Sequence, residues 1–257
     1  MLHTVTRGTG RPVVLLHGFA TSHKYWNQVL AFLPEKDFKI FMPDMLGFGQ
    51  SSKPDDNDYG VDEHVEALVS SLLNKSGSPV TLVGHSMGAM VATRIAVLYP
   101  HLVSRLVLIN LPLFTSKEQA KQMILHDSPL LYRAYISPIG KLIYATRDTK
   151  LTKTVPRVLY PKKPEMQDVA GEYLSHTRVS LLRSLHNTIL GYQPMADLQD
   201  IGTKTTLIYS PEDCYLSQSS LCIIKGMTHI ETVKLSGGHQ LPLQQAEAIA
   251  DVICVKA

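Results

Sequence analysis

Residues 83–88 read V-G-H-S-M-G and separate two segments of different character. The residues before them, 79–82, form a short apolar run typical of a buried strand, and the residues after them read A-M-V-A-T-R-I-A, which favours a helix. A serine on a sharp strand-to-helix turn adopts a strained backbone, and the residues two positions away must be small for the chain to close. The stretch therefore predicts that Ser86 projects from the C-terminal edge of a sheet, towards the positive end of the new helix.

The composition describes a globular chain without a nucleic-acid-binding surface. Its 257 residues are enough for one large α/β domain or two smaller ones with a sizeable core. Hydrophobic residues make up 44% and charged residues 18% of the chain, which excludes an intrinsically disordered protein. The net charge is only +3 and the basic residues are scattered, so we expect no nucleic-acid partner.

Cysteine usage and hydropathy indicate a reducing, aqueous compartment. Cys214, Cys222 and Cys254 form no C-x-x-C pair and are predicted to be free thiols. The N-terminus lacks the pattern of a secretory signal, and no stretch approaches the roughly 18 apolar residues of a membrane span. We therefore predict a cytoplasmic protein without a membrane span, and the sequence leaves its oligomeric state unknown.

Short apolar runs alternate with helix-like segments in the first part of the chain. Strands are predicted at residues 13–16, 38–42, 79–83 and 103–109, and helices at residues 21–33, 61–73 and 87–99. Strands that are apolar throughout suit a parallel sheet with both faces covered. The alternation therefore predicts an α/β fold, with a mostly parallel β-sheet flanked by helices.

The pattern changes in the middle of the chain and then returns. Residues 112–195 are helix-like, rich in Leu, Tyr and Met, and carry no clear strand run. The alternation resumes with a strand at 205–209, a helix at 216–225, a strand at 229–235 and a helix at 243–255. We therefore predict an α/β core made of residues 1–111 and 196–257, interrupted by a helical lid at 112–195.

Two further side chains follow the later strands and complete a possible proton relay. A serine hydroxyl needs a base, usually a histidine held in one tautomer by a carboxylate. Asp213 follows the strand at 205–209, and His239 follows the strand ending at residue 235. Both residues are therefore predicted to lie at the carboxyl ends of strands, at the same edge of the sheet as Ser86. Sites form at this edge in open α/β sheets. Glu212 is the alternative acid, and Asp213 fits the position better.

An attack on a carbonyl also needs donors for the developing negative charge. We expect the backbone N–H groups of Met87 and Phe19 to form this oxyanion hole, because Phe19 lies on the turn after the strand at 13–16.

The motifs together resemble those of the α/β-hydrolase superfamily, and in particular its lid-containing, carboxylesterase-like serine hydrolases. L-L-H-G-F (15–19) resembles the oxyanion loop of that family, and P-D-M-L-G-F-G-Q-S (43–51) resembles its P-D-x-x-G-x-G-x-S segment. G-H-S-M-G resembles the nucleophile elbow, S-P-E-D the acid turn, and G-G-H followed by A-E-A-I-A-D-V-I the histidine loop and last helix. The resemblance implies a serine hydrolase that uses no metal and no organic cofactor.

The chain departs from the family pattern at three places. Ser210 stands where the acid turn usually has Gly, and Ala246 stands where the last helix usually has Pro. The first strand of the family is expected to be absent or very short, because the H-G-F motif comes after only 16 residues. The departures at Ser210 and Ala246 do not touch the chemistry.

Several other polar residues near the motifs are expected to have structural roles. His85 is expected to face away from the pocket, and His17 to brace its loop through backbone hydrogen bonds. Asp44 and Ser51 are expected to stabilise their own loop. The acidic run at residues 55–60 lacks the glutamate of a calcium loop and is expected to be a solvated turn.

The resemblance leads to one preferred reaction and two alternatives. The preferred reaction is hydrolysis of a small or medium hydrophobic ester, thioester or lactone through an acyl-enzyme on Ser86. The first alternative is a C–C bond hydrolase of the meta-cleavage-product type, whose members usually carry Asn at the position of His85. The second is a receptor or regulatory protein of the same fold with slow turnover.

Overall fold

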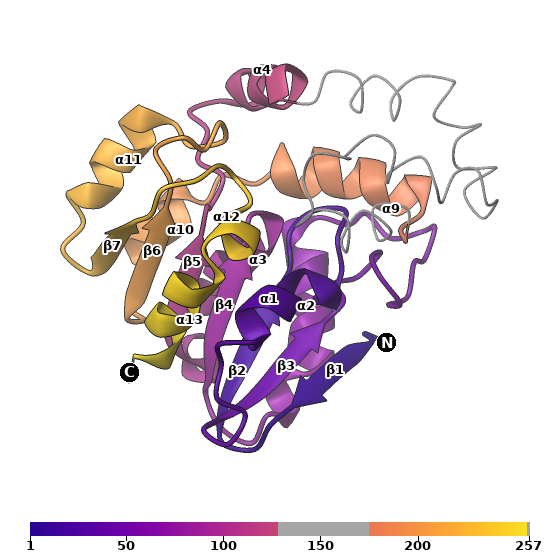
Figure 1. Ribbon diagram of the computed structural model, residues 1–257. Coiled ribbons are helices and arrows are strands. Elements are labelled where there is room, and N and C mark those ends of the chain that lie inside the picture. The colour runs from indigo at the N-terminus through magenta and orange to yellow at the C-terminus, as the bar shows by residue number, and fades with distance from the viewer. Residues whose placement is uncertain (128–174, 256–257) are drawn as a thin grey trace.

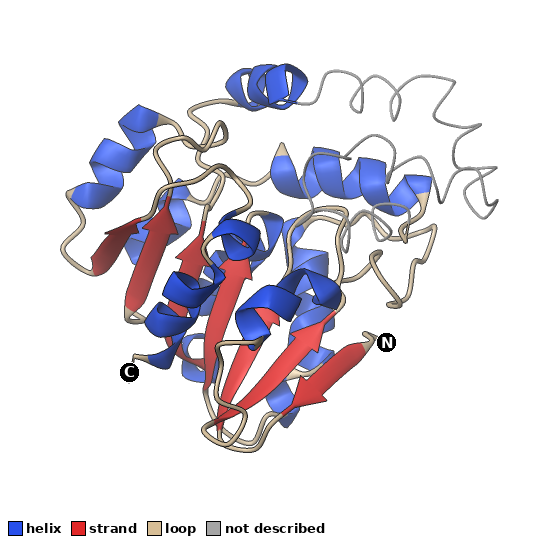
Figure 2. Ribbon diagram, viewed as in Figure 1, coloured by secondary structure: helices blue, strands red, loops and turns tan. Residues whose placement is uncertain are grey.

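A seven-stranded sheet lies between two layers of helices in the computed structural model, which describes residues 1–127 and 175–255 (Figure 1; Figure 2). The strands are β1 (Thr4–Arg7), β2 (Arg11–Leu16), β3 (Phe38–Pro43), β4 (Val80–His85), β5 (Val103–Ile109), β6 (Thr205–Tyr209) and β7 (Ile230–Lys234). They are ordered β1-β3-β2-β4-β5-β6-β7, and every neighbouring pair is parallel except β1 with β3. The predicted α/β fold with a mostly parallel sheet is confirmed.

Helices cover both faces of this sheet. The helices of the described part are α1 (Asn27–Leu30), α2 (Val61–Ser71), α3 (Met87–Leu98), α4 (Lys117–Asp127), α9 (Arg178–Arg183), α10 (Met195–Asp200), α11 (Gln218–Lys225), α12 (Leu241–Gln244) and α13 (Ala246–Cys254). In Figure 1, α1, α12 and α13 lie in front of the sheet, whereas α2 and α3 lie behind it. Beyond the C-terminal ends of the central strands lie α4 and α9.

The two layers explain why four successive residues of β2, Val13–Leu16, are all apolar. In β2, Val13 and Leu15 belong to the hydrophobic cluster that contains residues of α1 and α13, whereas Val14 and Leu16 belong to the cluster of α2 and α3. All four side chains are fully buried. Because successive residues of a strand point to opposite faces, a sheet covered on both sides needs an apolar residue at each position.

Two predicted helices are interrupted in the structure. The helix expected at residues 21–33 is a 3-10 turn, η1 (His23–Trp26), followed directly by the single turn of α1. Ser22 caps η1 by accepting the N–H of Lys24 at 3.4 Å. The helix expected at 243–255 is divided into α12 and α13 by Gln245, which has a non-helical backbone. Both sets of residues still bury their apolar side chains on the same face of the sheet.

The antiparallel edge strand β1 has no counterpart in the predicted elements. It has four residues, and its pattern of half-buried and exposed side chains contains no apolar run. The expectation of an absent or very short first strand agrees with this short element. The helical lid expected at 112–195 falls largely on residues 128–174, which lie outside the described residues, so the lid remains a prediction. Within the described ranges, no helix is long and apolar enough to cross a bilayer.

A buried histidine, His64 of α2, makes the stability of the fold sensitive to mild acid. His64 Nε2 lies 3.4 Å from Ser184 Oγ, and its Nδ1 atom has no hydrogen-bond partner among the described residues. Burial, and to a smaller extent the nearby His17, lower the pKa of His64 from 6.5 to about 3. Between these two pH values the unfolded chain binds a proton here that the folded chain excludes. The free energy of unfolding should therefore fall by about 1.4 kcal/mol per pH unit as the pH decreases below 6.5.

The variant His64→Gln tests this dependence, because glutamine is polar and does not titrate. In urea denaturation between pH 7 and pH 5, we expect the free energy of unfolding of the variant to fall less steeply than that of the wild-type protein. The two slopes should differ by about 1.4 kcal/mol per pH unit, the value for one proton. His101→Gln is the matched control, because His101 is exposed and its substitution should leave the slope unchanged. Equal slopes for wild type and His64→Gln would contradict the assignment.

Candidate active site

Ser86 occupies a strained turn between β4 and α3. Its backbone has φ of 53° and ψ of −120°, a left-handed conformation that is uncommon for a residue with a side chain. Its N–H donates to the carbonyl oxygen of Ile109 at 3.1 Å, which fixes the turn to the neighbouring strand β5. The side chain is buried but retains 8% exposure. The strained turn expected from the sequence is therefore present.

The two flanking glycines are needed for the close packing of this turn. A Cβ atom on Gly84 would collide with the backbone of Gly88, and a Cβ atom on Gly88 would collide with the carbonyl oxygens of Leu16 and His17. The second contact brings the start of α3 against the loop that follows β2. A larger residue at position 84 would force β4 and α3 apart, and one at position 88 would force α3 away from this loop.

The structure brings the three predicted relay residues together at one sheet edge. Ser86 Oγ lies 2.8 Å from His239 Nε2, and His239 Nδ1 lies 3.0 and 2.9 Å from the two carboxylate oxygens of Asp213. The N–H of Tyr215 donates to Asp213 at 2.9 Å, which holds the carboxylate in place. In this geometry the Nδ1–H of His239 donates to Asp213, which leaves Nε2 free to accept the proton of Ser86.

The relay is nearly excluded from solvent. The side chain of Asp213 is 1% exposed and that of His239 is 13% exposed. The ring of Tyr215 packs edge-on against the imidazole of His239, with 4.6 Å between the ring centroids. A low local dielectric strengthens the interaction between the carboxylate and the imidazole.

The alternative acid Glu212 has a different environment. Its carboxylate lies 2.5 Å from Ser210 Oγ and accepts the N–H of Gly237 at 3.1 Å. The hydrogen bond from the Ser210 hydroxyl, and to a smaller extent the one from the Gly237 N–H, lower the pKa of Glu212 below its ordinary value. Ser210 Oγ also contacts the carbonyl oxygen of Gly237. Glu212 and Ser210 therefore tie the acid turn to the histidine loop, and neither contacts the imidazole of His239.

Asn110 connects the end of β5 with both of these loops. Its side-chain amide donates to the carbonyl oxygens of Gly238 and His239, each at 3.0 Å, and its Oδ1 accepts the N–H of Ser210 at 3.1 Å. Asn110 has φ of 44°, a left-handed conformation that asparagine tolerates better than most residues. The sequence analysis missed this residue. It stands directly after a strand, but its contacts are with residues about 100 or more positions later.

His85 supports the histidine loop from the other side. Its Nε2 donates to the carbonyl oxygen of His239 at 2.8 Å, and its ring stacks on Tyr25 with 4.8 Å between centroids. Tyr25 in turn donates to the side chain of Gln240 at 2.7 Å. Burial, together with the nearby His239, holds the pKa of His85 well below its ordinary value. The neutral ring of His85 therefore holds the backbone of the relay histidine, in line with the structural role expected for it.

The loop of the second expected oxyanion donor runs beside Ser86. A Cβ atom on Gly18 would lie 3.3 Å from the Cβ atom of Ser86, so the backbone just before Phe19 passes close to Ser86. Met87 is the first residue of α3, where backbone N–H groups have no partner within the helix. His17 braces this loop through its ring, which contacts the carbonyl oxygen of Gly18 at 2.8 Å and accepts the N–H of Met45 at 2.9 Å.

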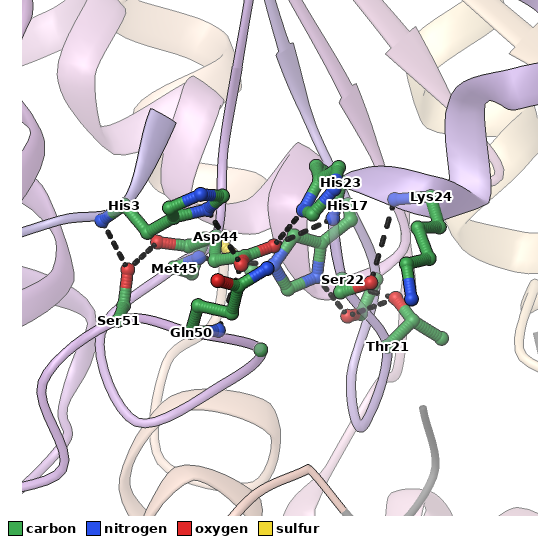
Figure 3. A network of polar contacts seen from close by, with 12 residues as sticks. His3, His17, Thr21, Ser22, His23, Lys24, Asp44, Met45, Gln50 and Ser51 are labelled. Atoms are coloured by element: carbon green, nitrogen blue, oxygen red, sulfur yellow. Dashed lines mark hydrogen bonds and ion pairs between the residues drawn. The ribbon is translucent and has the colours of Figure 1, made fainter. Parts of the chain in front are cut away.

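Asp44 organises the loop that follows β3 (Figure 3). It accepts the backbone N–H groups of His23 at 2.7 Å and Gln50 at 2.8 Å. Ser51 Oγ donates to the carbonyl oxygen of Asp44 at 2.5 Å and accepts the N–H of His3 at 2.9 Å. The roles expected for Asp44 and Ser51 therefore agree with the structure, although the two residues also fix the loop of His23 and the N-terminal segment.

Comparisons with known proteins support the fold. The family described as alpha/beta hydrolase fold matches residues 11–180. Lipase LipV of Mycobacterium tuberculosis (strain ATCC 25618 / H37Rv) is 27% identical over 261 residues, which cover 98% of this chain and 96% of the lipase. The probable lysophospholipase BODYGUARD 2 of Arabidopsis thaliana is 26% identical over 199 residues, which cover 70% of this chain and 42% of that protein. The chain thus spans less than half the length of the latter relative.

Two solved structures have the same fold. The thioesterase domain from the curacin biosynthetic pathway superposes with a TM-score of 0.72 at 24% identity, covering 99% of this chain and 95% of that domain. The esterase from Exiguobacterium antarcticum superposes with a TM-score of 0.75 at 17% identity, covering 98% of this chain and 93% of the esterase. Because the family match extends over well over half of the sequence, the chain belongs to the α/β-hydrolase fold family.

Proposed function

We propose that this protein is a serine hydrolase that cleaves a small or medium hydrophobic carboxylic ester, thioester or lactone through an acyl-enzyme on Ser86. The observation that carries the proposal is the continuous contact from Ser86 Oγ through the imidazole of His239 to the carboxylate of Asp213. The names of the relatives, a lipase and a probable lysophospholipase, support an ester as the substrate class.

In the proposed reaction, His239 takes the proton of Ser86 while the serine oxygen attacks the carbonyl carbon. The N–H groups of Phe19 and Met87 stabilise the oxyanion. The proton on His239 passes to the leaving alcohol or thiol, which leaves an acyl group on Ser86. A water molecule then gives its proton to His239 and attacks the acyl carbon, and the acid is released as Ser86 is regenerated.

Aromatic side chains around the relay support a hydrophobic substrate. The ring of Phe19 packs against Phe48 with 5.9 Å between centroids, and the ring of Phe114 packs against Tyr215 with 6.5 Å between centroids. Tyr215 is also the ring in contact with His239. An aromatic environment of this kind suits an apolar acyl chain and provides few polar partners for a charged group.

A fluorophosphonate probe tests the proposal directly, because it reacts with an activated serine. After digestion, mass spectrometry should locate the label on the peptide that contains Ser86. A panel of p-nitrophenyl esters with increasing acyl length should then show turnover that depends on chain length. A label on another residue, or no label together with turnover below one product per hour for every ester, would contradict the proposal and favour a binding role.

A further inference from the structure

A cluster of two imidazoles and one carboxylate lies beside the candidate active site and takes no part in the proposed reaction. His3 directly precedes β1, His23 begins η1, and Asp44 directly follows β3. His23 Nδ1 lies 2.8 Å from Asp44 Oδ1, and His3 Nδ1 lies 3.2 Å from Asp44 Oδ2. One ligand atom from each residue falls within 4.8 Å of the others. Figure 3 shows both rings directed at the same carboxylate.

The carboxylate is fixed independently of the two imidazoles. The backbone N–H groups of His23 and Gln50 each donate to one of its oxygens, at 2.7 and 2.8 Å. Each oxygen therefore has one backbone donor and one histidine ring nitrogen. If the two rings no longer hydrogen-bonded to the carboxylate, the backbone N–H groups would still orient it. Outer-shell hydrogen bonds orient the ligands of a metal site in the same way.

The separations between these atoms fit a metal coordination shell. Zinc binds imidazole nitrogen and carboxylate oxygen at about 2.0–2.2 Å, so two such ligands lie about 2.9 Å apart at a right angle and about 3.4 Å apart at a tetrahedral angle. The observed distances of 2.8 and 3.2 Å lie close to this range. The Asp44 side chain is fully buried, whereas His23 is 12% and His3 is 33% exposed, so an ion can reach the cluster from solvent.

The charge of the cluster also favours a cation. The carboxylate of Asp44 accepts hydrogen bonds from the backbone N–H groups of His23 and Gln50, and such bonds stabilise its ionised form. Asp44 is therefore ionised at neutral pH. A neutral imidazole can move its proton from Nδ1 to Nε2, so that Nδ1 binds a metal without a net loss of protons from the ring.

We propose that His3, His23 and Asp44 form a binding site for a divalent transition-metal ion of the zinc type. Two imidazoles and a carboxylate are a donor set that suits zinc better than magnesium or calcium, which prefer oxygen ligands. The site joins three separate segments: the residue before β1, the turn η1 and the loop after β3. A bound ion would stabilise the edge of the sheet against unfolding. The inference is independent of the proposed hydrolase function.

Isothermal titration of the full chain with Zn²⁺ tests the site. The protein should carry no polyhistidine tag, and it should be treated with a chelator and transferred to chelator-free buffer at about pH 7.5, where imidazoles are neutral. We expect one equivalent of Zn²⁺ to bind the wild-type chain and to raise its melting temperature. His3→Gln and His23→Gln should each weaken binding by more than about 10-fold and remove the rise in melting temperature. Co²⁺, titrated in the same way, should give a visible absorption spectrum that both variants lose.

His101→Gln is the matched control for the loss of one histidine. His101 is exposed in the turn at the N-terminal end of β5, whereas Asp44 follows the C-terminal end of β3, so its substitution should leave Zn²⁺ binding unchanged. Circular dichroism of both ligand variants without metal should show the wild-type fold. The proposal is overturned if the wild-type chain shows no saturable Zn²⁺ uptake, or if the folded His3→Gln and His23→Gln variants bind Zn²⁺ as tightly as the wild type.

Discussion

Ser86→Ala is expected to fold like the wild-type protein and to lose turnover of p-nitrophenyl butyrate by about 10⁴- to 10⁶-fold. Alanine keeps the Cβ atom and therefore the packing of the turn, but it removes the only atom that can attack the carbonyl. The hydrogen bond lost from His239 Nε2 is a small part of the stability of the fold. The measurement is kcat/KM, with near-UV circular dichroism to verify the fold.

Ser104→Ala is the control, because Ser104 is an exposed serine of β5, a strand that contributes no relay residue. It should retain the wild-type kcat/KM. If Ser86→Ala kept more than a tenth of the wild-type value, the acyl-enzyme on Ser86 would be excluded, although the zinc site proposed above would not be affected.

Asp213→Asn is expected to reduce kcat by about 10³- to 10⁴-fold with little change in structure. The asparagine amide can present an N–H group to His239 Nδ1, which then accepts rather than donates. The ring proton moves to Nε2, and Nε2 can no longer accept the proton of Ser86. The effect is on the protonation of His239, so KM should change much less than kcat.

Glu212→Gln is the matched control for this loss of a carboxylate. Glu212 contacts Ser210 and Gly237 rather than the imidazole, so its amide variant should keep kcat within about threefold of the wild type. If Glu212→Gln lost more activity than Asp213→Asn, the acid of the relay would be assigned to the wrong residue.

The strands and the proximity of Ser86, Asp213 and His239 could be predicted because both depend on patterns that are local in the sequence. β5 and β6 have the bounds expected from their mainly apolar sequences, since almost all of their side chains are buried between the two helix layers. Ser86, Asp213 and His239 follow strands of one parallel sheet, and the carboxyl ends of such strands meet at one edge.

The remaining features depend on contacts that no local pattern indicates. β1 is stabilised by its pairing with β3 and has too few apolar residues to be recognised. The helical segment begins at His23 rather than at residue 21, because Ser22 caps η1 and Asp44 accepts the N–H of His23. The contacts of Asn110 join residues far apart in the sequence, and a polar residue after a strand has many possible partners.

The side chain of Asn110 also makes the loops that carry Asp213 and His239 interdependent in protein engineering. β5 contributes no reacting group, yet one amide at its end sets the separation of the segments that carry Asp213 and His239. In loop exchange between members of the fold, these two segments and the end of β5 would have to be transferred together. If the loop that carries Asp213 were transplanted alone, it would lack the asparagine side chain that aligns it with the imidazole of His239.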